Sequence, residues 1–271
     1  MIKISNKIVS QEHFPDGSLL LKLDEHPFIF NYNFLGQSTF DKIVTWHYEN
    51  DSELFTLICL TKYFQEQGIK VILHMPYCPH ARMDRVKNRD EVFTLKYFCD
   101  TINSLNFSEV HILDPHSNVC TALLNNVHVQ NPSAYISKAM DKIEDKDLVA
   151  FYPDEGAMKR GTDYLGGAYA FGIKKRDWET GKIQGLEIMN KDVVRDRNVL
   201  IIDDICSKGG TFYHSAKALK EAGAKNIYLY ITHCENSILT GDLITSGLVK
   251  KIYTTNSLFT AQHDLIEVIE L

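Results

Sequence analysis

The segment Val199–Thr211 reads VLIIDDICSKGGT, and its order of residue types indicates how the chain folds. Four consecutive apolar residues predict a buried strand, two aspartates follow directly, and a glycine-containing turn then opens a helix. Glycine lets backbone N–H groups approach an anion closely, and a helix N-terminus attracts negative charge. The segment therefore predicts a strand, a phosphate-binding turn and a helix in succession.

The two aspartates of this segment, Asp203 and Asp204, argue against an ordinary turn. An aspartate can simply cap a helix, but two adjacent carboxylates after a buried strand are costly unless something binds them. Ribose hydroxyls or a magnesium ion would fit such a pair. The turn beyond them offers two hydroxyls, a cation and two glycines to a phosphate, so we expect a ribose-phosphate site that also includes Ser207, Lys208, Gly209, Gly210 and Thr211.

The rest of the chain alternates short apolar, β-branched runs with longer segments of helical period, which predicts an α/β fold with mainly parallel sheets covered by helices. Helices are expected at Asp51–Gln67, Glu91–Leu105 and Thr211–Ala222, the last with Phe212, Ala216 and Leu219 facing inward. Strands are expected at Ser18–Leu23, Lys42–Trp46, Lys70–Met75, Glu109–Asp114, Leu148–Tyr152, Ala168–Ile173, Asn198–Asp203, Asn226–Thr232 and Lys251–Thr255.

Composition narrows the class of protein. The chain has 271 residues and a net charge of -6, with both signs interspersed, which argues against nucleic acid as a partner. No apolar run approaches the roughly 18 residues of a membrane helix, and the start MIKISNKIVS lacks a secretory pattern, so we expect a cytoplasmic protein without a membrane partner. The 6 cysteines include no CxxC pair, which favours reduced, mostly buried thiols.

The segment Asp141–Asp147, DKIEDKD, is highly charged and precedes a predicted strand. Such a segment is a candidate link between two halves of the chain. We therefore expect an N-terminal domain over residues 1–143 and a C-terminal domain over residues 144–271.

The segment Val199–Thr211 resembles the ribose-phosphate loop of type I phosphoribosyltransferases and of PRPP synthetases, the ribose-phosphate pyrophosphokinases that make 5-phosphoribosyl 1-diphosphate (PRPP). Further segments resemble PRPP synthetase motifs in the same order and cover nearly the whole chain, although both ends are shorter than is usual in the family. These segments are Phe14–Gly17 (FPDG), Pro76–Arg85 (PYCPHARMDR), Asp114–His116 (DPH), Lys174–Arg176 (KKR), Ala222–Lys225, Thr232–His233 and Thr255–Ser257.

The resemblance implies two tandem phosphoribosyltransferase-like domains, each a mainly parallel sheet flanked by helices. The N-terminal domain would carry the ATP-binding loop, and the C-terminal domain would carry the ribose-phosphate loop. The implied reaction is magnesium-dependent transfer of the β,γ-diphosphate of ATP to the anomeric hydroxyl of ribose 5-phosphate, which gives PRPP and AMP. The implied partners are these small molecules and further copies of the chain, in a dimer or a larger homo-oligomer.

For the nucleotide, the resemblance implies five contact residues. Arg82 and Asp84 would bind ATP from the Pro76–Arg85 segment, and His116 would lie at the ATP phosphates. Phe14 would reach the adenine from a neighbouring subunit, with Asp16 at the amino group. Taken alone, the same residues could also form a surface ion-pair cluster, a buried histidine and a plain turn.

For catalysis, the resemblance implies that Lys174 and Arg176 close over the transferring phosphates from a mobile loop, together with His116. His116 and Asp154 would be the metal ligands, because an imidazole and a carboxylate at strand ends can hold magnesium directly or through water. Two cations two residues apart would stabilise the charge that develops during transfer. A solvated run of charge before a turn is the ordinary alternative for Lys174–Arg176.

Four positions depart from the family pattern. Met83 stands where glutamine is usual and Ser18 where glutamate is usual, while Ser207 and Lys208 replace an aspartate and a threonine. The extra cation at Lys208 leaves open a larger acceptor such as ADP-ribose for the same transfer. A non-catalytic regulatory homologue that only binds nucleotides is a third hypothesis, against which the joint presence of the catalytic, metal and sugar residues argues.

Overall fold

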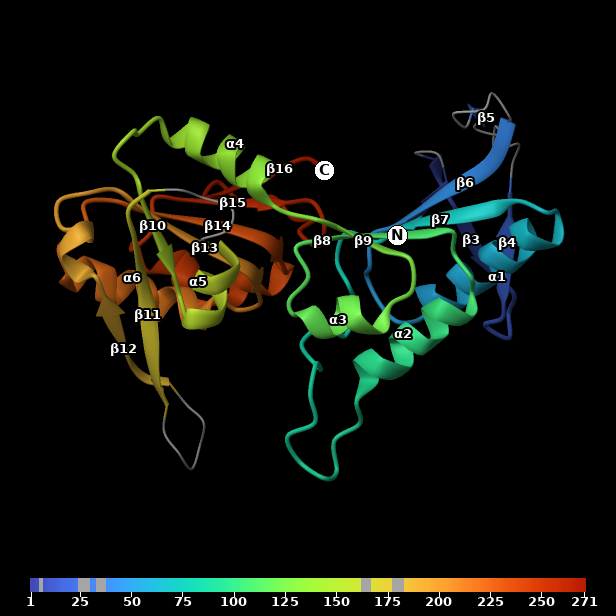
Figure 1. The fold of residues 1–271 in the computed structure, drawn as a ribbon, viewed down its shortest axis with the longest axis horizontal. Coiled ribbons are helices and arrows are strands. Elements are labelled where there is room, and N and C mark those ends of the chain that lie inside the picture. The colour runs from blue at the N-terminus through green and yellow to red at the C-terminus, as the bar shows by residue number, and fades with distance from the viewer. Residues whose placement is uncertain (5–6, 24–29, 33–37, 162–166, 177–182) are drawn as a thin grey trace. The chain divides into compact units, whose positions relative to one another are not determined.

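The computed structural model describes residues 1–4, 7–23, 30–32, 38–161, 167–176 and 183–271, in two compact units, Met1–Gln130 and Asn131–Leu271 (Figure 1). The boundary between the two units lies before helix α4 (Ser133–Ile143). The charged segment Asp141–Asp147 had instead suggested a boundary after residue 143. Helix α4 belongs with the second unit because it packs beside strand β16 (Ile266–Ile269), where Lys142 Nζ lies 2.6 Å from Glu267 Oε1.

The first unit is built on a sheet in the order β2-β1-β6-β7-β8-β9, with β5 paired to β6. Strands β6 to β9 are parallel, and β1, β2 and β5 add antiparallel pairs. Figure 1 shows the three helices on the same side of the parallel strands. The bounds are β1 Ile2–Ile4, β2 Lys7–Ile8, β5 Phe30–Tyr32, β6 Ser38–Trp46, β7 Lys70–His74, β8 Glu109–Leu113, β9 Val127–Gln130, α1 Glu53–Glu66, α2 Thr94–Ser104 and α3 Asn118–Leu123, with a separate hairpin of β3 Ser10–His13 and β4 Leu19–Lys22.

The second unit is built on a sheet in the order β12-β11-β10-β13-β14-β15-β16, parallel except for β12. Every residue of central strand β14 is buried, as a strand covered on both faces requires. Figure 1 shows α4 and α6 on opposite sides of this sheet. The bounds are β10 Val149–Tyr152, β11 Tyr169–Arg176, β12 Ile183–Met189, β13 Val199–Cys206, β14 Ile227–Cys234, β15 Lys251–Thr255, α5 Glu155–Gly161, α6 Gly210–Glu221 and α7 Asp242–Thr245, with 3-10 turns η1 Lys191–Val194 and η2 Asn236–Thr240.

The predicted α/β class with mainly parallel sheets is confirmed. Each predicted strand and helix overlaps an observed one, and Phe212, Ala216 and Leu219 of α6 are buried as expected. The helix expected at Glu91–Leu105 begins later, at Thr94, and Val92 before it is 60% exposed. The cysteines are free, and all but Cys59 are buried.

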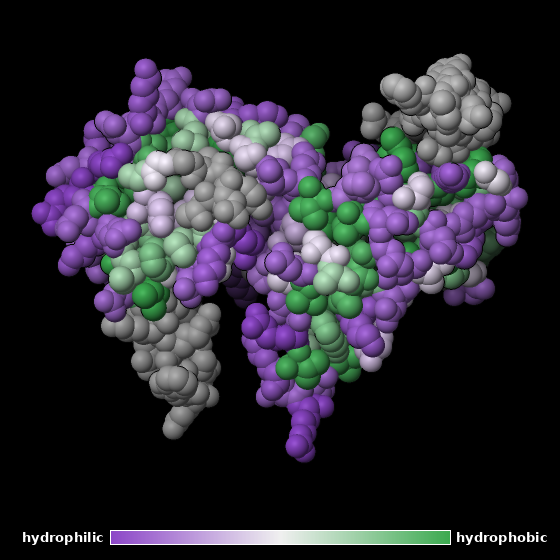
Figure 2. Space-filling model, in the orientation of Figure 1, coloured by the Kyte–Doolittle hydropathy of each residue, from purple (hydrophilic) through white to green (hydrophobic). Residues whose placement is uncertain are grey.

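The visible face of each unit is mostly hydrophilic, with smaller hydrophobic patches (Figure 2). In the first unit such a patch lies over α2, α3 and the segment before α2, where Val86, Val92 and Tyr97 are exposed. Among the described residues, no helix is both long and apolar enough to cross a membrane.

Candidate active site

Asp203 and Asp204 lie inside strand β13 rather than beyond its end. The strand continues to Cys206 and pairs with β14, so that Asp203 stands opposite Ile231. Successive strand residues point to opposite sides, and the two carboxylates accordingly differ in exposure. The Asp204 side chain is 3% exposed and that of Asp203 is 12% exposed. The sequence correctly grouped the pair but placed the end of the strand three residues too early, at Asp203 instead of Cys206.

A third carboxylate, Asp154, belongs to the same group. It follows β10, the neighbour of β13 in the sheet, and its Oδ1 accepts a hydrogen bond of 2.9 Å from the backbone N–H of Ala157 in α5. Burial, followed by the nearby charges of Asp204 and Asp154, raises the pKa of Asp203 well above its usual range. Three predicted site residues are thus brought together at the carboxyl ends of adjacent strands.

Arg160 of α5 supplies the cation of this group, and sequence reasoning did not select it. Its Nη2 donates to Asp204 Oδ1 at 2.6 Å and lies 3.5 Å from Asp203 Oδ1. The guanidinium lowers the pKa of Asp203 and partly offsets the burial. In the sequence, Arg160 is marked only as a basic residue six positions after Asp154. Such a spacing is too common to identify a site residue.

The turn after β13 joins this strand to helix α6 through Gly209 and Gly210, the two glycines of the predicted phosphate site. Gly209 has φ +79°, and a Cβ there would lie 3.2 Å from a methyl of Leu243, so glycine is required. A Cβ at Gly210 would meet nothing within 4 Å, which leaves open space where helix α6 begins. Gly241 lets the Lys208 carbonyl pack against its α-carbon, since a Cβ there would overlap that oxygen.

The Ser207 hydroxyl is tied to a neighbouring segment that the sequence analysis also missed. Ser207 Oγ lies 3.1 Å from Ser237 Oγ, and Ser237 Oγ donates to Glu235 Oε2 at 2.9 Å. The Glu235 carboxylate is therefore linked through the Ser237 hydroxyl to Ser207. The resemblance implies an aspartate at this position. No feature of the sequence places residues 235–237 beside residue 207.

Lys174 and Arg176 lie at the end of β11, where the resemblance implied a loop. The strand pairs antiparallel with β12, and its register shifts between Lys175 and Arg176. Residues 174–176 are in a strand because β12 pairs with β11 as far as Arg176, whereas β10 pairs with β11 only as far as Phe171. The side chains of residues 174–176 lie outside the described part of the structure.

In the first unit, the Pro76–Arg85 segment meets the segment that follows β8. Arg85 Nε lies 3.0 Å from Asp84 Oδ1, and the Asp84 side chain is only 9% exposed. Burial alone would raise the pKa of Asp84, but Arg85, Ser117 and the charge of His116 lower it. The Ser117 hydroxyl lies close enough to contribute, although among the described residues its Oγ makes no hydrogen bond of standard geometry. Asp84 and His116 are thus neighbours.

Phe14 and Asp16 lie in the tight turn of the β3–β4 hairpin. The turn is closed by Phe14 N–H to Ser18 carbonyl at 2.9 Å, and the Phe14 side chain is 51% exposed. Asp16 Oδ1 accepts bonds from the Ser18 hydroxyl and backbone N–H, which lower the pKa of Asp16. Asp16 therefore has a structural role in its own turn, and Phe14 is presented to solvent. Arg82 is also exposed.

The described residues contain no cluster of three or more His, Cys, Asp or Glu side chains arranged to enclose a metal ion. His116 belongs to the first unit and Asp154 to the second.

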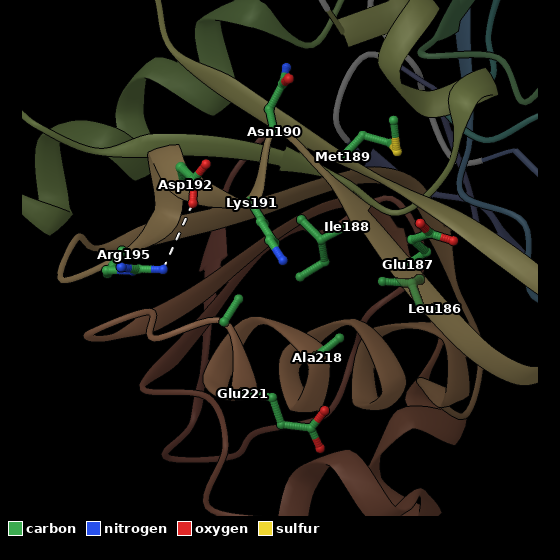
Figure 3. A pocket seen from close by; sticks show the side chains of 11 residues that line it. Leu186, Glu187, Ile188, Met189, Asn190, Lys191, Asp192, Arg195, Ala218 and Glu221 are labelled. Carbon is green, nitrogen blue, oxygen red and sulfur yellow. Dashed lines mark ion pairs between the residues drawn. The ribbon is translucent and has the colours of Figure 1, made fainter.

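A separate cavity of about 680 Å³ lies between β12, η1 and the C-terminal half of α6 (Figure 3). Its charged lining combines Glu187, Asp192 and Glu221 with Lys191 and Arg195, so it offers no excess of cations to a phosphate. None of the predicted site residues lines it.

Fold and site together define a phosphoribosyltransferase-type protein, in which a strand bearing two aspartates leads into a glycine turn and a helix. A solved phosphoribosylpyrophosphate synthetase from Mycobacterium smegmatis shares this fold, with a TM-score of 0.77 and 17% identity over 97% of this chain and 86% of that one. No model of a known protein family matches the chain.

Relatives with closer sequences identify the family. A ribose-phosphate pyrophosphokinase from Thermosipho africanus is 30% identical over 218 residues, which cover 78% of this chain and 67% of that protein. One from Sulfurisphaera tokodaii is 27% identical over 269 residues, covering 95% and 85%. The chain belongs to the ribose-phosphate pyrophosphokinase family.

Proposed function

We propose that the protein transfers the β,γ-diphosphate of ATP to the anomeric hydroxyl of ribose 5-phosphate. The anomeric oxygen forms a bond to the β-phosphorus, the bond from that phosphorus to the α-phosphate oxygen breaks, AMP leaves and the hydroxyl proton is released. The observation that carries the proposal is the cluster of three aspartates in which Asp203 and Asp204, on the strand before the glycine turn, lie close to Asp154. The names of the relatives support the same acceptor.

In the second unit, the proposal gives the sugar hydroxyls to the aspartate pair and the 5-phosphate to the Ser207–Thr211 turn. Carboxylates accept hydroxyl protons, whereas backbone N–H groups and the start of α6 bind phosphate oxygens. Lys174 and Arg176 would stabilise the moving phosphates. Most of the catalysis would then come from positioning and charge stabilisation, without a covalent enzyme intermediate.

In the first unit, the proposal gives ATP to Arg82, Asp84 and His116. His116 and Asp154 would hold magnesium, which when bound neutralises charge on the substrate phosphates. The position of Asp84 close to the charge of His116 supports this assignment.

A coupled assay for AMP release from ATP and ribose 5-phosphate tests the proposal. We expect AMP and PRPP in equal amounts, both dependent on magnesium and on the acceptor, with the product confirmed by mass spectrometry. ATP binding without any AMP release would instead support a non-catalytic regulatory protein.

A second candidate acceptor, ADP-ribose, is suggested by Lys208, whose cation could face a second phosphate. If ribose 5-phosphate is the acceptor, Lys208→Thr should change its kcat/KM by about tenfold or less. If the acceptor is ADP-ribose, the same change should cost far more with ADP-ribose than with ribose 5-phosphate. Both acceptors should be measured on the wild-type protein and the variant.

Phe14 links the proposed ATP site to a homo-oligomer. Its side chain is 51% exposed at a hairpin turn, so it is available to a neighbouring copy. Dilution to the monomer should then weaken ATP binding and activity together. A fully active monomer in a combined sizing and activity experiment would exclude a shared site.

A further inference from the structure

Arg160 holds the two sugar-site aspartates unequally. Its Nη2 hydrogen-bonds Asp204 Oδ1 at 2.6 Å, within the short range of charge-assisted bonds, but lies 3.5 Å from Asp203 Oδ1. The two carboxylates have similar chemistry and adjacent positions, yet only one of them is held at hydrogen-bond distance by the guanidinium.

Exposure and backbone contacts show the same asymmetry. The Asp204 side chain is 3% exposed, whereas that of Asp203 is 12% exposed. Asp203 Oδ1 also accepts the backbone N–H of Asp204 at 3.0 Å, so one oxygen of Asp203 is already held by the backbone of its own strand. Two neighbouring buried carboxylates repel each other when both are ionised, and a nearby guanidinium reduces that repulsion.

The guanidinium lies close to Gly156 in the first turn of α5. A Cβ at Gly156 would lie 3.8 Å from Arg160 Nη1 and 3.3 Å from Asp154 Oδ1. The guanidinium and the Asp154 carboxylate therefore both pass close to the one residue of this helix turn that lacks a side chain. Lys159, the adjacent basic residue, instead lies 3.5 Å from Glu155 with both side chains 69% exposed.

We propose that Arg160 is a positioning residue that anchors Asp204, and that Asp203 is the carboxylate that binds the sugar hydroxyls. The inference rests on the proposed function and assigns different roles to the two aspartates. Without the guanidinium, the charge of Asp204 would displace Asp203 from its binding direction. Removing the Asp204 charge at the same time would relieve that repulsion.

The test compares Arg160→Met, Asp204→Asn, the double variant Arg160→Met/Asp204→Asn and Asp203→Asn, with Lys159→Met as matched control. Binding of ribose 5-phosphate is measured by titration calorimetry, and KM and kcat are measured at saturating ATP. We expect Arg160→Met and Asp203→Asn each to weaken binding about tenfold or more. The double variant should recover to within about threefold of wild type, because its two changes are coupled through one contact. Lys159→Met should bind like wild type.

Two results would overturn the inference. A double variant that binds as weakly as Arg160→Met, or more weakly, would show that Asp204 itself holds the sugar. Arg160→Met that melts earlier but binds ribose 5-phosphate with wild-type affinity would show a purely structural role. If Arg160→Met does not fold, the double variant, which also removes the Asp204 charge, is compared directly with Asp204→Asn, and the expected result is again binding within about threefold of wild type.

The same data separate this inference from the proposed function. Wild-type protein that binds ribose 5-phosphate but releases no AMP contradicts the proposed transfer, and the binding comparison still decides the role of Arg160. Wild-type protein that does not bind ribose 5-phosphate overturns both.

Discussion

The proposed sugar residues and the proposed nucleotide residues depend on the fold in different ways. In the second unit, Asp203 and Asp204 lie inside a strand between β10 and β14, and the Arg160 guanidinium lies within 4 Å of both carboxylates. In the first unit, Arg82 and Asp84 lie outside the sheet, in the connection between β7 and α2, where Arg82 and Arg85 are exposed and the Asp84 side chain is 9% exposed.

This difference predicts how binding and stability respond to mutation in each unit. A strand residue in a sheet cannot change without affecting its neighbours, whereas a surface connection tolerates change because few core contacts depend on it. We expect substitutions of the second unit's carboxylate group to alter stability and binding together. Substitutions in the first unit's connection should alter binding alone.

The largest effect on activity is expected from substitutions of Lys174 and Arg176. These substitutions test whether residues at the end of a strand contribute to catalysis. Lys174→Ala and Arg176→Ala should each lower kcat about a hundredfold or more, because they remove charge that would stabilise the transferring phosphates. ATP affinity should stay within a few fold. Lys175→Ala, which removes the same charge between them, is the control, and steady-state kinetics of all three is the measurement. Normal turnover in both site variants would remove this strand end from the mechanism.

The next prediction concerns the coupling of stability to the carboxylate group. Arg160→Met should lower the free energy of unfolding by about 2–3 kcal/mol, because it leaves the Asp204 carboxylate buried without this cation. Arg195→Met is the matched control, since its Nη2 lies 3.8 Å from Asp192 and both side chains are more than two-thirds exposed. That pair should contribute less than about 1 kcal/mol. Urea unfolding of both variants decides, and equal losses would contradict the difference between buried and exposed pairs.

Asp84→Asn tests the opposite behaviour in the first unit. We expect KM for ATP to rise about fivefold with little change in the melting temperature, and Asp90→Asn in the same connection should leave both unchanged. The pKa of Asp84 is lowered, so any stability from its ionised form is present at neutral pH and is lost as pH falls through that lowered pKa. The difference in melting temperature between wild type and Asp84→Asn should therefore shrink on acidification. A difference that grows as pH falls would contradict this sign.

Local pattern made part of the site predictable. In Val199–Thr211, the strand, the aspartates, the turn and the helix follow one another in the chain, and the buried face of α6 follows from its period. The same reasoning failed for β12 and β16, which mix polar and apolar residues, and for the end of β13, where carboxylates continue a strand.

Contacts between distant residues made the rest unpredictable. Arg160 is separated by 44 positions from Asp204, and Ser237 by 30 from Ser207. Each is an ordinary residue in its own segment and gains importance only where the sheet brings the segments together. For the first unit, resemblance to a family selected Arg82 and Asp84, since no period or spacing there distinguishes a nucleotide loop from a surface ion pair.

The smallest effect is expected from Ser237→Ala, which tests whether the phosphate turn can be improved. A hydroxyl has one proton to donate, and Ser237 gives its proton to Glu235 at 2.9 Å. Ser207 must then donate to Ser237, 3.1 Å away, and its proton is not available to a phosphate oxygen, which only accepts. Ser237→Ala releases that proton, so KM for ribose 5-phosphate should fall about two- to fivefold with kcat unchanged. Ser207→Ala/Ser237→Ala should return KM to the wild-type value, since the released hydroxyl is gone. Steady-state kinetics with ribose 5-phosphate is the measurement, and a rise in KM for Ser237→Ala would show that the Glu235–Ser237 link supports the phosphate turn instead of restraining it.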